Sequence, residues 1–448
     1  NTWLVYISLF CATYISVYID YRITPLFVWP ILIISYYLIL IKRRVEPVLF
    51  LILSSKFITG FAVPTNTSAF MVVNLLVNYL PIFIVLIIHT LKRGHLNIIS
   101  NYKFTICYLV FALLYSIPHP ELASQLIVKE YFPLLMFVLT AGIFYKNIDY
   151  SVIVRFLRPL LICSLVVYII PERFETNIIL NTLPLLNRIP TQETINFISL
   201  DVFRNSGFLW DTRSMGVVCY IFLYITLRKD RENFNFNMLV GVVVLLSTLS
   251  RGAIGVGIII LFTYFITEVV NGRFIKPMLI LLTLITASIG IVGSGVVEVE
   301  DNFFGSFNLT SDNNALSQRS GFREYSLEHF YEHPMGSGVG YLKGVGPDRN
   351  IPIKGGTFHT VNDAFLFSKL GEMGALGFIL FLLSLSEVIL SRKLYSLMLL
   401  LGIVMQLTGT DLPDTKQFYF VFLVLLSRLN IEGSKKQLYR NGKYFEKN

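Results

Sequence analysis

The chain has 448 residues, of which 54% are hydrophobic and only 15% are charged. Soluble domains carry about 25% charged residues, so this composition excludes an ordinary soluble protein and predicts a polytopic membrane protein. The formal net charge is +9, with 37 Lys and Arg against 28 Asp and Glu. Membrane proteins concentrate Lys and Arg in cytoplasmic loops. Because no basic stripe interleaved with aromatic residues is present, no nucleic-acid partner is expected.

Long apolar stretches predict a single integral membrane domain over residues 1–448, an all-α bundle of about 14 transmembrane helices. The first run lacks a basic leading segment and is therefore expected as a span and not as a cleaved signal peptide. The runs that begin at 103 and 236 are the shortest for crossing a bilayer. The spans are expected at 3–20, 23–41, 45–63, 69–91, 103–117, 130–145, 152–171, 213–228, 236–250, 252–271, 275–293, 371–391, 394–410 and 414–430.

The basic clusters between these spans fall in alternate loops, and a basic tail follows the last span. The positive-inside rule places all of them, and both termini, in the cytoplasm. Two loops on the opposite, outward side are long, at 171–212 and 294–370. Long loops in a compact protein usually carry function.

Within the second outward loop, residues 317–340 predict an amphipathic helix followed by a glycine-rich turn. Arg319 and Arg323 are four residues apart and therefore share one face of this helix. Pro334 is expected to end it, because proline cannot continue a helix. The glycines that follow allow tight backbone turns.

Arginines stand out on the outward side, where the positive-inside rule disfavours them. The planar guanidinium group suits phosphate oxygens, and Arg251 lies near the N-terminus of a span, where an anion is stabilised. The set predicts a phosphorylated lipid as ligand, and contact with lipid headgroups or ion pairing with nearby acids is the alternative. The set comprises Arg173, Arg188, Arg204, Arg213, Arg251, Arg319 and Arg323.

A polar group precedes the span at 371–391. His359 is the candidate general base because its pKa normally lies near 6.5, and a hydrogen-bonded structural histidine is the alternative. Asn362 and Asp363 are candidates for substrate binding or for capping the following helix. Glu372 is a candidate binding residue because acids inside membranes are often functional, although a solvated carboxylate is the alternative.

Several catalytic motifs are absent from the sequence. It has no GxSxG, no HExxH, no P-loop and no DxD pair. Metal-independent chemistry without a cofactor is therefore expected.

Four stretches together resemble the superfamily of O-antigen polymerases (Wzy type) and O-antigen ligases. They are RNSGFLWDTRSMG (204–216), LLSTLSRGAIGVGIII (245–260), RSGFREYSLEHFYEHPMGSGVG (319–340) and HTVNDAFLFSKLGEMGALG (359–377). The resemblance covers the second half of the chain. The family often has Asn directly after His, whereas here Thr and Val intervene between His359 and Asn362. The family arginine is either Arg204, which is preferred, or Arg213.

The resemblance implies a glycosyltransferase of the bacterial inner membrane whose active site faces the periplasm. Its substrate would be an oligosaccharide linked to undecaprenyl pyrophosphate, and membrane lipid would surround it. An acceptor hydroxyl would attack the anomeric carbon and lose its proton to His359. Arg251, with Arg204 or Arg213, would hold the pyrophosphate, while Arg319 and Arg323 would hold lipid phosphate or glycan.

Alternatives remain open within and outside this family. A polymerase is preferred over a ligase that transfers glycan to lipid A-core, and a chain-length regulator protein is a candidate partner. A transporter or flippase of the lipid-linked glycan is the alternative from another class. A transporter should carry charges or broken helices near the middle of the membrane, and Lys56 and Glu268 are the nearest candidates.

Overall fold

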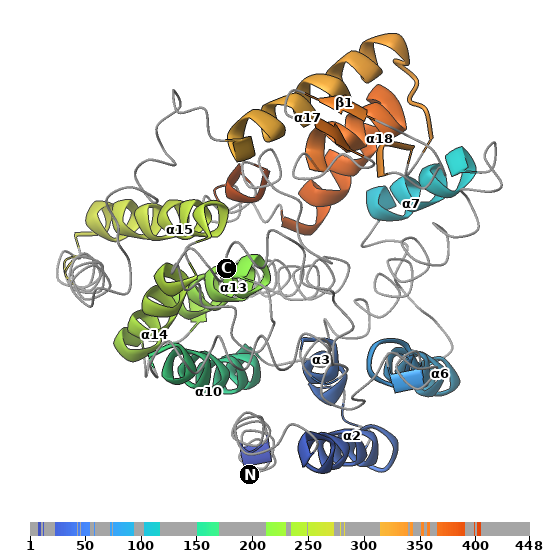
Figure 1. Cartoon of the computed structure of the whole chain (residues 1–448). Helices are drawn as coiled ribbons and strands as arrows, with labels where there is room; N and C mark the ends of the chain where they lie inside the picture. Colours follow the sequence, from blue (N-terminus) through green and yellow to red (C-terminus); the bar gives the residue numbers. More distant parts are fainter. Residues whose placement is uncertain are drawn as a thin grey trace, which may run out of the picture. The chain divides into compact units, whose positions relative to one another are not determined.

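The computed structural model is predominantly helical, which confirms the expected fold class in its coarse form (Figure 1). Among the residues that the structure describes, the exception is one hairpin of two short antiparallel strands. The structure describes residues 23–42, 44, 46–53, 72–73, 75–93, 103–116, 150–169, 212–229, 234–248, 250–272, 314–338, 341–343, 351–353, 356–358, 365–389 and 401–404, and the single positions 8, 9, 12, 58, 278, 282 and 398.

The chain divides into two compact units, each built from segments that are distant in sequence. Unit 1 comprises residues 1–92, 147–257 and 264–302, and unit 2 comprises residues 93–146, 258–263 and 303–448. The helices of unit 1 are α2 (Thr24–Leu40), α3 (Glu46–Leu53), the π-helix η2 (Leu75–Tyr79), α6 (Leu80–Arg93), α10 (Tyr150–Ile169), α13 (Thr212–Lys229), α14 (Phe234–Ser247) and most of α15 (Arg251–Val270).

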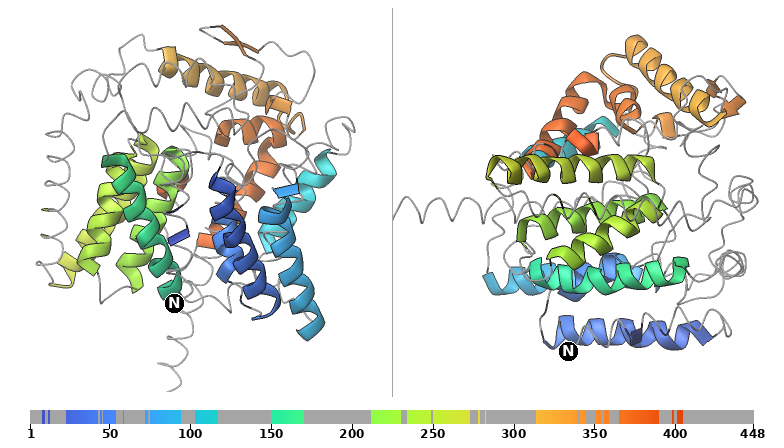
Figure 2. Two further views of the ribbon diagram at one scale, coloured as in Figure 1. Left: turned by 60° about the horizontal axis from the view of Figure 1, so that its bottom comes forward. Right: turned by 90° about the vertical axis from the view of Figure 1, so that its left-hand side faces the viewer.

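Helix α13 is buried along most of its length. It packs beside α10 and α14 (Figures 1 and 2), and every residue from Met215 to Thr226 is buried. A helix that is apolar all round needs such surroundings. Two glycines permit its close packing, because a Cβ on Gly241 would collide with the side chain of Leu223 and a Cβ on Gly216 would collide with Ala253.

Helix α15 has one buried face and one exposed face, and both faces are apolar. The buried face includes Val256, Ile260 and Tyr264. Large apolar side chains are nevertheless exposed at intervals of four residues along the other face, at Ile258, Phe262, Ile266 and Val270. Residues four apart lie above one another on a helix, so these side chains form a continuous apolar stripe.

Two helices among the described residues are both long enough and apolar enough to cross a membrane. They are Gly252–Val270 and Leu366–Ser384. Further apolar helices of 10–17 residues occur at Thr24–Leu40, Leu75–Ile88, Lys103–Tyr115, Met215–Leu227 and Asn235–Ser247. The expected spans at 130–145 and 414–430 lie outside the described residues, as do all but a few positions of 3–20, 275–293 and 394–410.

Unit 2 is organised around a long helix, α18. Helix α7 packs along α18, with the rings of Tyr108 and Phe381 5.5 Å apart. Helix α17 lies across the N-terminal half of α18 (Figure 2). The elements of this unit are α7 (Lys103–Ser116), α17 (Asn314–Glu332), the 3-10 helix η7 (Tyr341–Lys343), β1 (Ile351–Ile353), β2 (Gly356–Phe358) and α18 (Phe365–Ile389).

The second outward loop has more structure than the sequence predicts. The expected helix is confirmed as α17, which ends at Glu332, two residues before Pro334, but its apolar and polar side chains are not separated onto two faces as an amphipathic helix requires. The β1–β2 hairpin, with Ile351 opposite Phe358, was not predicted. The expected start of a span at 371 is wrong, because α18 begins at Phe365. The charge of Lys369 makes this first turn look like a loop in the sequence.

Candidate functional site

The first turns of α13 and α15 meet at Gly216. A Cβ placed on Gly216 would lie 2.4 Å from the Cβ of Ala253 and 3.5 Å from the Cβ of Ser250. Arg213 precedes Gly216 by three residues, and Arg251 precedes Ala253 by two. With a rise of 1.5 Å per residue, each arginine is within about 5 Å of this contact along its own helix axis. The fold therefore brings two of the sequence-predicted arginines to one end of two adjoining helices.

The same place joins the N-termini of two long helices. Each helix N-terminus carries about half a positive charge and unpaired backbone N–H groups. Neither α13 nor α15 has an acidic residue in its first turn. In the part of the chain that the structure describes, the side chain of the N-cap residue Ser250 makes no capping hydrogen bond to α15. Both helix ends therefore favour an anion at this position.

In unit 2, the end of α17 is attached to a break in α18 by backbone contacts. Gly374 has φ 66° and ψ −174°, a conformation essentially restricted to glycine. Residues that follow α17 supply hydrogen bonds at this break. The N–H of Gly338 donates to the carbonyl of Glu372 at 2.9 Å, and the N–H of Ala375 donates to the carbonyl of Pro334 at 3.2 Å. We call residues 333–338 and 371–375 the α17–α18 junction.

Helix α7 also contributes to this junction. The hydroxyl of Tyr115 donates to the carbonyl of Gly336 at 2.9 Å and also contacts the carbonyl of Met335. Gly336 has φ 87°, and a Cβ there would lie 2.5 Å from the carbonyl oxygen of Glu372. The expected tight turn is therefore confirmed at Gly336, and also at Gly338, where φ is 108°.

Glu372 is fully buried, so the alternative that its carboxylate is solvated is wrong. Its Oε2 lies 3.0 Å from Nζ of Lys369, which is also buried. Its Oε1 has no hydrogen-bond partner among the described residues. Sequence analysis missed Lys369 as the partner of Glu372. The available signal was the spacing of three residues, which places opposite charges on one face of a helix.

The remaining candidate residues of unit 2 are only partly described. Arg319 and Arg323 both lie in α17, and Arg323 is half-buried. Its Nε is buried without a hydrogen-bond partner in the described part of the chain. His359 directly follows β2 in the sequence. Like Asn362 and Asp363, it lies outside the described residues, as does Arg204 of the first outward loop.

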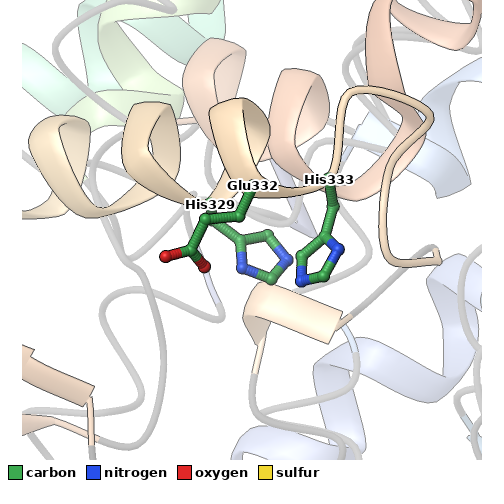
Figure 3. A group of neighbouring side chains, drawn as sticks. All are labelled: His329, Glu332 and His333. Atoms are coloured by element: carbon green, nitrogen blue, oxygen red, sulfur yellow. The ribbon is translucent and has the colours of Figure 1, made fainter.

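Sequence analysis also missed a cluster of possible metal ligands at the end of α17. His329, Glu332 and His333 each offer one ligand atom, and these atoms all lie within 4.8 Å of one another (Figure 3). They do not match the HExxH motif, because their order along the chain is the reverse, H-x-x-E-H. Their spacing of three and four residues, on a segment expected to be helical, was the signal that could have identified them.

Comparison of the chain with protein-family models, with curated proteins and with solved structures found no match. A functional interpretation therefore rests on the geometry of the two units and on the sequence motifs.

Proposed function

We propose that this chain is a membrane-embedded glycosyltransferase that polymerises O-antigen repeat units linked to undecaprenyl pyrophosphate. The observation that carries the proposal is the contact between the first turns of α13 and α15, which brings Arg213 and Arg251 to one place. The resemblance to O-antigen polymerases and ligases supplies the substrate class. The reaction would occur on the periplasmic side of a bacterial inner membrane.

The surface of the helices supports placement in a membrane. Helix α15 carries apolar side chains on both its buried and its exposed face. Helix α2 does the same, since Leu26 and Ile33 are exposed while Val28 and Ile31 are buried. Helices that are apolar on every side occur in buried cores or in membrane spans. We propose a bundle of about 14 spans with both termini in the cytoplasm, from span lengths and loop charges.

The chemistry of the leaving group suits the arginine pair. As the bond between the anomeric carbon and the pyrophosphate oxygen breaks, negative charge accumulates on the pyrophosphate. Arginine guanidinium groups and helix N-termini stabilise such charge. The contact at Gly216 supports Arg213 as a partner of Arg251, and Arg204 stays a candidate outside the described residues.

The acceptor sugar must lose a proton as its hydroxyl oxygen forms the new glycosidic bond. His359 is the proposed base, because an imidazole titrates in the physiological range and accepts this proton at one ring nitrogen. Asn362 and Asp363 are proposed to orient the sugars. Arg319 and Arg323 are proposed to contact glycan or lipid phosphate from α17.

A reconstitution experiment tests the proposal. The purified protein, in detergent or nanodiscs, is incubated with undecaprenyl-pyrophosphate-linked repeat units, and the products are separated on a gel. A ladder of longer lipid-linked glycans is expected. The variants Arg213→Ala, Arg251→Ala and His359→Ala should each abolish the ladder while their level in the membrane stays normal. Arg251→Lys should also fail, because an ammonium group does not reproduce the bidentate fork.

Arg228→Ala is the matched control, since Arg228 lies in the same helix as Arg213 but fifteen residues further on, about 22 Å away. Its ladder should match that of the wild-type protein. A wild-type ladder from the Arg213→Ala and Arg251→Ala variants contradicts the proposed role of the pair. Transfer that occurs only when lipid A-core is added would identify a ligase instead.

One observation favours a transporter as the second candidate. Helix α18 is broken at Gly374, and the buried ion pair of Lys369 and Glu372 lies directly before the break. Broken helices with buried charges form the binding sites of many transporters. Movement of lipid-linked glycan across a proteoliposome bilayer, without elongation, would support this function over the glycosyltransferase.

A further inference from the structure

The last turn of α17 and the residue directly after it, His333, present two imidazoles and a carboxylate close together. His329, Glu332 and His333 follow the pattern H-x-x-E-H, and positions three and four residues apart are neighbours on a helix. Their ligand atoms lie within 4.8 Å of one another (Figure 3). The geometry points to a binding site for a divalent transition metal, Zn²⁺ in the first instance, at the C-terminal end of α17.

The ring of His329 is held in place before any ion binds. It is 7% exposed, and it stacks on the ring of Tyr341 at a centroid distance of 4.9 Å and on Tyr325 at 6.3 Å. The interplanar angles are 20° and 15° respectively. Two aromatic neighbours therefore fix the orientation of this imidazole. A ligand whose rotamer is fixed by packing favours metal binding because less conformational entropy is lost.

The other two ligands are free to close onto His329. Glu332 and His333 are exposed, and the ring of His333 already meets that of His329 edge-on at 4.9 Å. Tetrahedral coordination at 2.0–2.1 Å places ligand atoms about 3.4 Å apart. Closure from 4.8 Å therefore requires movements of about 1.4 Å at most. Side-chain rotation of two exposed residues provides such movements.

The donor set selects the class of ion. Two imidazoles and one carboxylate suit Zn²⁺ and neighbouring transition metals, whereas Mg²⁺ and Ca²⁺ prefer oxygen ligands alone. Three protein ligands leave one tetrahedral position for water. The negative end of the α17 dipole also favours a cation here.

The site adjoins the α17–α18 junction. His333 is followed directly by Pro334, whose carbonyl accepts the N–H of Ala375 at the break in α18. An ion that ties His333 to the buried His329 would fix the end of the helix from which this connection starts. Metal binding is therefore expected to stabilise unit 2. This consequence does not depend on the proposed glycosyltransferase activity.

Metal binding to the full-length protein tests the inference. The protein is purified in detergent with a tag that contains no histidine, stripped with chelator, and titrated with Zn²⁺ by calorimetry. One equivalent is expected to bind, and the melting temperature should rise on binding. His333→Ala and Glu332→Gln should each weaken this binding by at least about 10-fold and remove most of the rise in melting temperature.

Glu328→Gln is the matched control, because it removes the same charge from an exposed position of the same helix. It should bind Zn²⁺ as the wild-type protein does. His329 is buried, so His329→Ala also removes packing, and the two exposed ligands decide the outcome. Equal Zn²⁺ affinity in wild type, His333→Ala and Glu332→Gln would overturn the inference, as would the absence of stoichiometric binding to the wild-type protein.

Discussion

Gly216→Ala should push the first turns of α13 and α15 apart. The new Cβ would lie 2.4 Å from the Cβ of Ala253, whereas two carbon atoms rest at about 3.5–4.0 Å. The obstacle is attached directly to the backbone of α15 and cannot rotate away. The two backbones must therefore separate locally by about 1–1.5 Å.

The expected loss of stability is modest and the expected loss of activity is large. Overpacking of this kind costs about 1–3 kcal/mol, and replacing glycine with alanine inside a helix returns about 0.5–1 kcal/mol. The net loss in the free energy of unfolding should be about 0–2.5 kcal/mol. A 1 Å displacement of groups that stabilise the transition state lowers rates by about 100-fold. We therefore expect glycan elongation to slow by about this factor.

Thermal unfolding in detergent and the rate of ladder formation measure the two effects. Gly255→Ala is the matched control, because a Cβ at Gly255 in α15 meets nothing within 4 Å, and it should lower neither quantity. Ala253→Gly removes the obstacle. The double variant with Gly216→Ala should therefore be more stable than the sum of the single effects predicts. Wild-type stability and rate in Gly216→Ala, or the absence of coupling to Ala253→Gly, would refute the reasoning.

Three further predictions concern the α17–α18 junction. Glu372→Gln leaves the ammonium of Lys369 buried without its counter-charge and should lower the free energy of unfolding by about 3–5 kcal/mol. Lys369→Met combined with Glu372→Leu should recover most of this loss. Denaturant unfolding of both variants measures the two effects, and a Glu372→Gln protein as stable as the wild type contradicts the prediction. Tyr115→Phe removes a hydrogen bond to Gly336 and should cost about 1 kcal/mol, measured as a lower melting temperature; an unchanged melting temperature means that the bond contributes nothing. Gly374→Ala forces an alanine into a glycine-only conformation, with its Cβ 2.6 Å from the carbonyl oxygen of Pro334. It should lower the free energy of unfolding by more than about 2 kcal/mol. A melting temperature equal to that of Gly255→Ala would disprove this prediction.

Helix positions in this chain follow from local sequence. Sequence analysis expected spans at 152–171, 213–228 and 252–271, and the structure has α10, α13 and α15 within two residues of these limits. Apolar runs bounded by charged or polar residues determine such limits, because each helix must bury or expose its own side chains. The same local information predicts that α17 ends before Pro334.

Features that depend on distant contacts could not be predicted. The break at Gly374 exists because the backbone of residues 334–338 lies against α18, and no local pattern encodes that neighbour. Glu372 illustrates the same limit, since its burial and its pairing with Lys369 depend on helices that cover α18. The proximity of Arg213 and Arg251 depends on Gly216. A glycine is needed there because Ala253 of another helix lies against it, and the sequence around Gly216 does not indicate that neighbour.

The pairing of α7 with α18 also affects the order in which the chain can fold during synthesis. Tyr115 and its hydrogen-bond acceptor Gly336 are 221 positions apart. At a synthesis rate of 5–20 residues per second, α7 therefore waits roughly 10–45 s for its partner. Helices α10, α13 and α14, by contrast, are complete within residues 150–247. The face of α7 that carries Tyr108 thus remains uncovered while this three-helix group assembles, so a chaperone or insertase that shields α7 during this interval should raise the yield of folded protein.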